Sequence, residues 1–322
     1  MKIIVTGGAG FIGSNLCGRL LEDGHDVLCV DSLLTGSREN IAEFLQHPHF
    51  LFLEHDVTQP FDAEADAIFH LASPASPIGY MEHPLETILV NSQGTHRMLK
   101  MARQQHAKFL VSSTSEIYGD PLVHPQTEEY WGNVNSIGPR ACYDESKRLG
   151  ETLTMEYYRQ YATDVRIVRI FNTYGPKNQM NDGRMIPNFI VQALKNEPIT
   201  IYGDGSKTRS ICYVSDLVEG LLRAMFKPHT TGEVFNLGNT EERTVLEFAQ
   251  TIVGLCNASL DINGQPHIIF EPSRVDDPER RRPNINKAKH ILGWEPKVSM
   301  EDGLRHSIAW YTQRIAQVSA PV

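Results

Sequence analysis

The chain of 322 residues carries 30 Lys and Arg against 39 Asp and Glu, which gives a formal net charge of −9. This acidic balance argues against a dedicated nucleic-acid binder, because such proteins normally present a basic surface. Hydrophobic residues make up 41% of the chain and charged residues 21%, as in an ordinary globular protein of one large or two moderate domains. No apolar stretch approaches the ~18 residues that a membrane-spanning helix needs.

The predicted elements alternate between short β-branched runs and helical patterns along the first half of the chain. In chain order we expect strand 2–6, helix 13–23, strands 26–30, 50–54 and 67–71, helix 85–105, strand 108–112, helix 143–161 and strand 165–171. Such alternation predicts an α/β fold built on a Rossmann-type, doubly wound parallel sheet with helices on both faces.

A glycine-rich turn follows the first predicted strand and opens the first predicted helix. Gly7, Gly8, Gly10 and Gly13 satisfy both Gly-x-Gly-x-x-Gly and Gly-x-x-Gly-x-x-Gly. The missing side chains let the backbone approach a pyrophosphate, and the helix N-terminus offers it N–H groups. Asp31, at the end of the second strand, is placed to bind adenosine ribose hydroxyls and to repel a 2′-phosphate. The turn therefore predicts NAD rather than NADP, and the position of Asp31 argues against the alternative of a turn without a ligand.

The domain organisation follows from this turn and from a change of pattern after residue 175. Prolines and the turn 203–205 break the second half of the chain into shorter pieces. We predict an NAD-binding domain over residues 1–174, with a strand near 233–240 returning to its sheet. Residues 175–322 are then mainly an interleaved α/β substrate-binding portion.

Tyr143 and Lys147 lie four residues apart at the start of the predicted helix 143–161, so both side chains share one face. Tyrosine ionises near pH ~10, too high for a base at neutral pH unless a cation stabilises the phenolate. We expect Lys147 to supply that charge. Such a pair recurs by chance in many helices, but this one follows the glycine turn and the polar run 112–119 at the end of a buried strand, where α/β folds display reactive groups.

These motifs together resemble the extended short-chain dehydrogenase/reductase family, the NAD-dependent epimerases and dehydratases that act on nucleotide sugars. The resemblance covers nearly the whole chain and rests on the glycine turn, Asp31, 70–72, 114–119, the Tyr143/Lys147 pair and 169–176. More narrowly, the chain is similar to the UDP-glucuronate decarboxylases, which make UDP-xylose. That similarity rests on longer and more specific strings, which are 73–77, 124–126, 138–145, 181–184 and 281–283.

One segment separates close relatives within this family. In the sugar 4,6-dehydratases the segment that matches Thr114-Ser115-Glu116 reads Thr-Asp-Glu, and its Asp protonates the departing hydroxyl. Ser115 cannot serve as that acid. In the 4-epimerases the position of Glu116 is usually not acidic, whereas the decarboxylases resemble this chain in having Ser-Glu. The resemblance therefore favours decarboxylation.

The same resemblance implies a mechanism. Tyr143 takes the C4 hydroxyl proton of the sugar, Thr114 hydrogen-bonds the same oxygen, and Lys147 holds the phenolate. Oxidation at C4 makes a β-keto acid that loses CO2, C5 is reprotonated, and NAD ends each cycle as it began. Arg281 is assigned to the substrate carboxylate, beside Ser115 and Glu116, although Arg280-Arg281-Arg282 alone would suggest a solvated charge run.

Further contacts to cofactor and substrate are also implied by the resemblance. The expected cofactor contacts are Gly7, Gly10, Phe11, Ile12, Gly13, Asp31, Ser32, Thr35, Gly36, Ser37, Asp56, Val57, Leu71, Ala72, Ser73, Tyr143, Lys147 and Thr173. The expected substrate contacts are Tyr80, Asn172, Arg184, Tyr202, Arg209 and Arg281. Arg209 is expected at the diphosphate, because a guanidinium fork fits phosphate oxygens. Arg274 departs from the family pattern, and its role stays open.

Other functions stay open at this point. One is a UDP-glucuronate 4-epimerase or another nucleotide-sugar epimerase or dehydratase. Another is an NAD-binding regulatory or scaffold protein with a decayed active site, against which the intact Thr114, Tyr143 and Lys147 argue. The closest histidine pair, His47-x-His49, has no third ligand at suitable spacing, so we expect no metal.

The expected partner is UDP-glucuronate, with no nucleic acid and no membrane. Five cysteines without close pairing predict neither a disulfide framework nor a zinc site, which favours a cytoplasmic protein. The start of the chain shows no apolar segment of the signal-peptide kind. The family resemblance implies a homodimer formed through helices 85–105 and 143–161.

Overall fold

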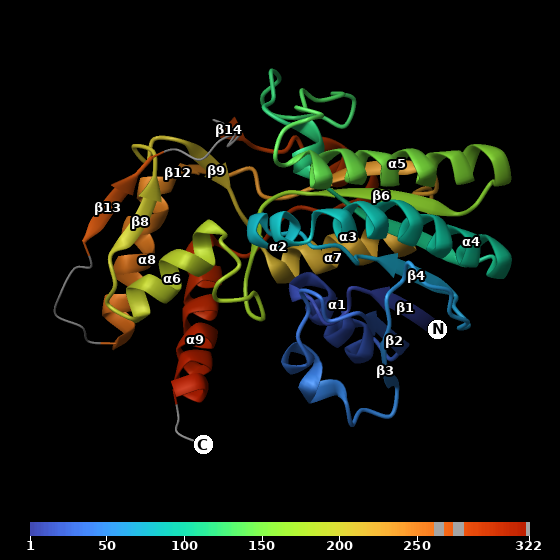
Figure 1. The fold of residues 1–322 in the computed structure, drawn as a ribbon, viewed down its shortest axis with the longest axis horizontal. Coiled ribbons are helices and arrows are strands. Elements are labelled where there is room, and N and C mark those ends of the chain that lie inside the picture. The colour runs from blue at the N-terminus through green and yellow to red at the C-terminus, as the bar shows by residue number, and fades with distance from the viewer. Residues whose placement is uncertain (261–266, 273–279, 320–322) are drawn as a thin grey trace.

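The computed structural model describes residues 1–260, 267–272 and 280–319. Its centre is a seven-stranded, all-parallel sheet in the order β11-β6-β5-β4-β1-β2-β3 (Figure 1). The strands are β1 (Lys2–Thr6), β2 (Asp26–Asp31), β3 (Phe50–Glu54), β4 (Ala67–His70), β5 (Lys108–Thr114), β6 (Val165–Ile170) and β11 (Glu233–Leu237). The predicted fold class is confirmed. The strand order reverses between β1 and β4, and in such sheets ligands bind outside the carboxyl ends of the strands at that point.

Helices cover both faces of this sheet (Figure 1). Helices α4 (Thr95–Gln105) and α5 (Ala141–Tyr161) pack on one face, and α1 (Phe11–Glu22) and α7 (Val214–Phe226) pack on the other. Alternate strand residues point to opposite faces, so Ile4 joins the core under α4 while Ile3 and Val5 join the core under α1. Strands buried on both sides explain the nearly continuous apolar runs in the sequence.

A smaller portion lies beside the carboxyl edge of the sheet and has its own core. It consists of α6 (Met185–Leu194), α8 (Val245–Leu260) and α9 (Met300–Ser319), with the parallel pair β8 (Ile199–Tyr202) and β13 (Ile268–Glu271). Ile190, Phe248 and Leu304 bring these helices together in one apolar cluster. Figure 1 shows this portion at the left, with α9 ending away from the sheet.

Short elements connect the two parts of the molecule. They are β7 (Thr173–Tyr174) with β10 (Cys212–Tyr213), and β9 (Thr208–Ser210) between β12 (Glu242–Thr244) and β14 (Arg280–Arg281). The short helices are η1 (Arg38–Phe44), α2 (Pro77–Glu82), α3 (Pro84–Leu89), η2 (Val90–Gly94), η3 (Ser115–Tyr118) and η4 (Ala288–Leu292). The strand expected near 233–240 is β11, which joins the large sheet beside β6. The predicted domain boundary after residue 174 stays a prediction.

The helix expected over 85–105 is wrong in one detail, because a π-helical turn at Val90–Gly94 separates α3 from α4. Gly94 lies against Val57, where an added side chain would come within 3.1 Å. The turn aims Asn91 inward, where its amide donates to Ser73 and to Ser146, both at 3.0 Å. Such turns are frequent at functional sites. Here it links the loop after β4 to α5.

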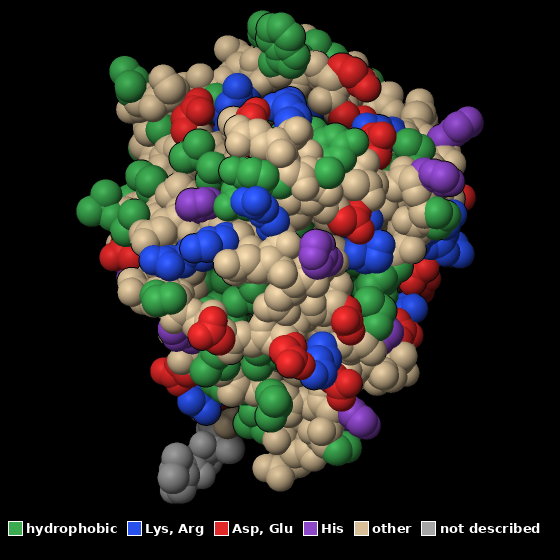
Figure 2. All heavy atoms as spheres, turned by 90° about the vertical axis from the view of Figure 1, so that its right-hand side faces the viewer, with side chains coloured by type: hydrophobic (Ala, Val, Ile, Leu, Met, Phe, Trp, Pro, Cys, Tyr) green, Lys and Arg blue, Asp and Glu red, His purple; other side chains and the backbone are tan. Residues whose placement is uncertain are grey.

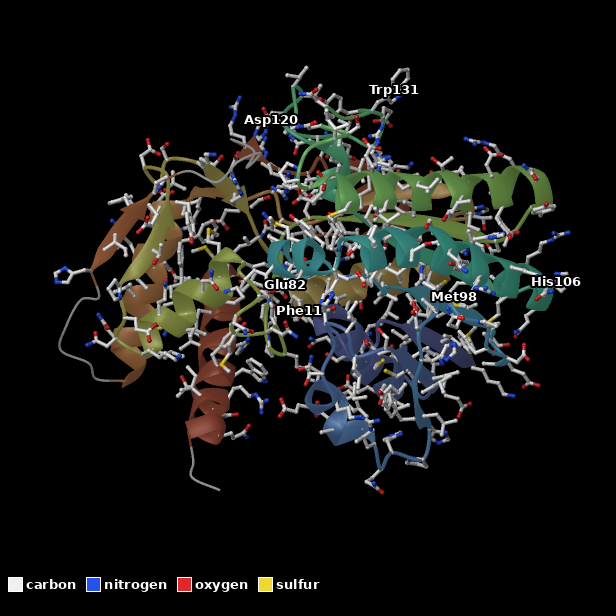
Figure 3. All side chains as sticks on the ribbon, in the orientation of Figure 1. Phe11, Glu82, Met98, His106, Asp120 and Trp131 are labelled. Carbon is white, nitrogen blue, oxygen red and sulfur yellow. The ribbon has the colours of Figure 1, made fainter. Side chains whose placement is uncertain are left out.

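A surface lobe over residues 119–140 connects η3 to α5. Figure 3 shows Asp120 and Trp131 at its outer edge, and the Trp131 side chain is exposed. On the face at the right of Figure 1, acidic and basic side chains are intermingled (Figure 2). Within the part of the chain that the structure describes, no helix has the length and apolar character to span a membrane.

Candidate active site

A cavity of about 1140 Å³ opens at the carboxyl edge of the sheet and reaches the smaller portion. It is lined by the glycine turn, the end of β2, the loop after β4, the end of β5 and the start of α5. Of the residues expected from the sequence to contact cofactor or substrate, all but Ser37 line this cavity. Ser37 instead caps η1, where its hydroxyl accepts from the Glu39 N–H at 3.3 Å.

The glycine turn is shaped by close backbone contacts. A Cβ atom on Gly13 would lie 2.1 Å from the Gly7 carbonyl oxygen, and one on Gly7 would lie 2.8 Å from the Ala72 backbone. Gly7 also has a φ of +70°, which L side chains rarely adopt. The turn therefore leaves the N-terminus of α1 open to the cavity, as a pyrophosphate requires.

Asp31 ends β2 on the other side of the turn. Its carboxylate accepts the Ala9 N–H at 2.9 Å and the Leu33 N–H at 2.8 Å, which orients it toward the cavity rim. Burial raises the pKa of Asp31 above its usual value, while these two hydrogen bonds oppose that rise. A bare backbone cradle beside an acceptor for ribose hydroxyls fits NAD.

Tyr143 lies in the first turn of α5 and is buried at the cavity wall. Its ring stacks on Tyr80, with centroids 5.0 Å apart and planes within 9°. Burial raises the pKa of Tyr143 to about 12, although a hydrogen bond with the Thr114 side chain opposes the rise. Thr114 ends β5, so the end of the strand meets the start of the helix at the expected catalytic pair.

Lys147 is also buried, one helical turn after Tyr143. Its ammonium group donates to the Ser112 carbonyl at 2.9 Å and lies 5.8 Å from the centroid of the Tyr143 ring. Burial lowers the pKa of Lys147 to about 7, opposed by Glu151. The expected proximity of the Tyr143/Lys147 pair is present in the structure. In the protein alone, however, desolvation dominates and shifts both pKa values in the direction of the neutral forms.

Glu116 is held between two guanidinium groups. Its Oε2 accepts from Arg140 at 2.5 Å, and its Oε1 accepts from Arg281, which arrives from β14. Burial opposes ionisation of Glu116, but Arg281, Arg140 and Arg209 outweigh it and hold the pKa of Glu116 below its usual value. Glu116 is therefore a carboxylate at neutral pH, next to Ser115 and within the same cavity.

Two charged residues near Glu116 were not among the site residues predicted from the sequence. Arg140 lies three residues before Tyr143 and lines the cavity. Asp144 follows Tyr143 and is buried, with no hydrogen-bond partner for its Oδ1. Burial and then Glu116 raise the pKa of Asp144 to about 7. Their proximity to Tyr143 in the sequence was the available signal, but only the fold shows that both face Glu116.

The expected substrate residues also line the cavity. Arg184 donates to the Ala75 carbonyl at 2.8 Å and pairs with Asp182 at 3.4 Å. Arg209 is buried in β9 and donates to the Thr208 carbonyl at 2.8 Å, whereas Tyr202 is 40% exposed at the end of β8. Arg274 lies outside the described residues.

The histidines considered as metal ligands lie elsewhere. His49 pairs with Asp26 at 2.9 Å on the surface, next to His47. His70 is a packed strand residue whose ring bonds the hydroxyls of Thr6 and Thr95. Over residues 1–260, 267–272 and 280–319, no three His, Cys, Asp or Glu side chains are grouped to hold a metal ion.

Comparisons with known proteins agree with this geometry. UDP-glucuronic acid decarboxylase 1 of Danio rerio is 50% identical over 314 residues, which are 98% of this chain and 73% of that protein. UDP-glucuronic acid decarboxylase 2 of Arabidopsis thaliana is 51% identical over 98% of this chain and 69% of that protein.

A solved structure with the same fold is the UDP-glucuronic acid 4-epimerase of Bacillus cereus in complex with UDP-glucuronic acid and NAD. It has a TM-score of 0.86 and 27% identity, over 98% of this chain and all of that one. The model of the NAD dependent epimerase/dehydratase family matches residues 3–238, from β1 past the end of β11. The chain therefore belongs to the NAD dependent epimerase/dehydratase family, and NAD is its cofactor.

Proposed function

We propose that this protein decarboxylates UDP-glucuronate to UDP-xylose through a 4-keto intermediate, with NAD restored in every cycle. The observation that carries the proposal is the cluster at the end of β5, where Ser115 and an ionised Glu116 lie beside Arg140 and Arg281. Such a cluster suits a sugar whose C5 bears a carboxylate. The decarboxylases that are about 50% identical over nearly the whole chain support the same reaction.

The alternative is a 4-epimerase, the activity of several proteins with this fold. Their identity to this chain is 30% or less, whereas the decarboxylases reach 51%. Fold similarity alone does not separate these activities, because one fold supports many reactions. The family resemblance places the difference in the Ser115-Glu116 segment.

Tyr143 is the proposed base for the C4 hydroxyl of the sugar. The Thr114 hydroxyl, hydrogen-bonded to it, binds the same oxygen and fixes its position. Lys147 stabilises the phenolate form of Tyr143 that accepts this proton, and its bond to the Ser112 carbonyl holds it in place. Tyr80, stacked on Tyr143, keeps the phenol ring in one orientation at the cavity wall.

When bound, NAD supplies the reversible oxidation of the sugar at C4. With a ketone at C4, the electron pair of the C5–carboxylate bond moves into a C4 enolate as CO2 leaves. Tyr143 and Thr114 donate hydrogen bonds to the enolate oxygen and stabilise its charge. The reaction consumes one proton, which is added at C5. The proton comes from solvent, and Glu116, held by Arg281, is the carboxylate placed to take it up and pass it to C5.

We also propose a homodimer formed through α4 and α5. A shallow groove between these helices is lined by Gln93, Leu149, Leu153 and Tyr157, and the exposed Tyr161 lies at its end. The five cysteines are all free thiols, which suits the reducing conditions of the cytoplasm. We propose that no nucleic acid is bound.

Incubation with UDP-glucuronate, without any added reductant, tests the proposed function. We expect release of CO2 and formation of UDP-xylose, measured by trapping the gas and by mass analysis of the nucleotide sugar. Formation of UDP-galacturonate without CO2 would instead support the 4-epimerase.

A further inference from the structure

The segment 176–184 lies between β7 and α6, where the chain passes into the smaller portion (Figure 1). It follows Thr173, an expected NAD contact, and several of its residues line the cavity. The segment is bonded to α1 and to the loop after β2 on one side of the cavity, and to α9 on the other. It therefore spans the cofactor end of the cavity, and we call it the strap.

Two hydrogen bonds tie the strap to the walls of the cofactor end. Asn15, in the second turn of α1, donates its amide to the Pro176 carbonyl at 3.2 Å. Gln179 donates to the Thr35 carbonyl at 2.7 Å. The first bond lies near the helix N-terminus that suits a pyrophosphate, and the second lies in the loop after Asp31, which suits the adenosine ribose. The strap thus crosses from one expected NAD subsite to the other.

Lys177 supplies a third tie between these two. Its ammonium group donates to Glu43 at 2.5 Å and lies 4.5 Å from the centroid of the Phe44 ring, and both partners belong to η1. Lys177 also has a φ of +69°, which L side chains rarely adopt, so its contacts rather than its backbone preference hold it there. The Glu43 side chain is 62% exposed, and an ion pair so close to solvent is weak and opens readily.

On the other side of the cavity the strap has a buried anchor. The Tyr311 hydroxyl of α9 donates to the Asn178 carbonyl at 2.9 Å, and both residues are buried. A buried hydrogen bond costs more to break than one that water can replace. The strap should therefore separate from η1 and from the loop after β2 while it stays attached to α9.

We propose that the strap is a gate for NAD, and that its ties to Glu43 and Thr35 set the rate at which the cofactor enters and leaves. These ties join groups of the protein itself, so they hold the gate closed without any contribution from NAD. Opening must then precede both entry and release. The inference rests on NAD as the cofactor and not on the identity of the sugar. A slow gate suits a cofactor that is reduced and restored within one cycle, because it must stay until its hydride is returned.

Two variants loosen the gate without touching the glycine turn. Lys177→Met removes the charge that pairs with Glu43 and keeps an unbranched stem against Phe44. Gln179→Ala removes the bond to Thr35. Each lost tie should favour the open strap by about 3-fold, and the double variant by about 10-fold. Glu43→Gln should reproduce the effect of Lys177→Met.

The test measures NAD exchange in the holoenzyme, with no sugar present. Protein that carries isotopically labelled NAD is mixed with excess unlabelled NAD, and the loss of label gives the release rate. Equilibrium dialysis gives the Kd for NAD, and the two values together give the association rate. We expect release to be about 3-fold faster in each single variant and about 10-fold faster in the double variant. The Kd should stay within about 2-fold, because a gate affects entry and release alike.

The matched control is Lys287→Met. Lys287 pairs with Glu233 at 2.7 Å and lies 5.5 Å from the centroid of the Phe235 ring, so it loses the same kinds of contact, but it is not among the residues that line the cavity. Its release rate should equal that of wild type. An unchanged release rate in the double variant, or faster release matched by an equal rise in the Kd, would overturn the inference. A failure to decarboxylate UDP-glucuronate would refute the proposed function and leave this result standing.

Discussion

The two ends of the cavity are built in different ways. At the cofactor end, the site is shaped by absent side chains, as at Gly7 and Gly13, with Asp31 as its principal charged group. At the reaction end, the site is made of charged side chains from three separate segments, which meet at Glu116. The cofactor end depends on backbone shape and the reaction end on electrostatic balance. Mutations at the first should therefore affect NAD binding and stability, and mutations at the second should affect the reaction.

The largest effect is expected at the cofactor end with Gly13→Ala. The new methyl group would lie 2.1 Å from the Gly7 carbonyl oxygen, so the turn must move, at a cost of about 1–3 kcal/mol or more. We expect loss of bound NAD and a lower melting temperature, measured by cofactor content and thermal unfolding.

Gly254→Ala is the matched control for that variant. Gly254 lies in α8, and an added Cβ there would meet nothing within 4 Å. Alanine favours a helix over glycine by about 0.5–1 kcal/mol, so this variant should be slightly more stable and retain NAD. Equal behaviour of the two variants would contradict the account of the cofactor end.

Tyr143→Phe should give the next largest effect, this time on chemistry alone. Removing the base lowers turnover by about 10²–10⁴-fold while NAD stays bound, because the glycine turn is untouched. The measurement is the rate of CO2 release beside cofactor content. Tyr158→Phe, an exposed tyrosine on the same helix, should have wild-type turnover. Unchanged turnover in Tyr143→Phe would contradict the assignment of Tyr143 as the catalytic base.

Glu116→Gln tests the charged cluster. The amide keeps the size of the side chain but loses the charge that balances Arg140 and Arg281. We expect loss of decarboxylation, with C4 oxidation partly retained, measured as CO2 release and as trapped 4-keto sugar. Glu156→Gln, at an exposed ion pair on α5, is the control. An unaltered rate of CO2 release in Glu116→Gln would refute the proposed role of Glu116 in decarboxylation.

Asp144→Asn should give the smallest effect, on the pH dependence of stability. Burial raises the pKa of Asp144 from 3.8 to about 7, so the folded protein binds the proton more tightly than the unfolded chain. The resulting stability is full at low pH and is lost as pH rises toward about 7. Asparagine does not ionise, so the melting temperature of the variant should rise relative to that of wild type between about pH 4 and about pH 7, and the difference should stay constant at higher pH. If the difference in melting temperature between the variant and wild type did not change over this pH range, the prediction would be wrong.

The sequence predicted the cofactor end of the cavity more fully than the reaction end. Gly7, Gly13 and Asp31 lie within one strand-turn-helix-strand unit, so the local sequence contains most of this geometry. The strands of the sheet were likewise predicted because their apolar runs reflect burial on both faces. The return of β11 to the sheet was also expected.

The reaction end could not be predicted as completely as the cofactor end, because its interactions join residues that are distant in sequence. Arg281 meets Glu116 across 165 positions, and Arg140 meets it across 24. The ionisation of Asp144 depends on their combined field. The π-helical turn between α3 and α4 was missed because helical periodicity does not distinguish such a turn from a continuous α-helix.

The most direct test of the central claim is turnover of UDP-glucuronate by the holoenzyme in heavy water, with the product examined by NMR and mass analysis. The account predicts UDP-xylose that carries one deuterium at C5 and none at C4, because C5 takes its proton from solvent and C4 recovers its own hydrogen. UDP-galacturonate as the product, or deuterium at C4, would contradict it.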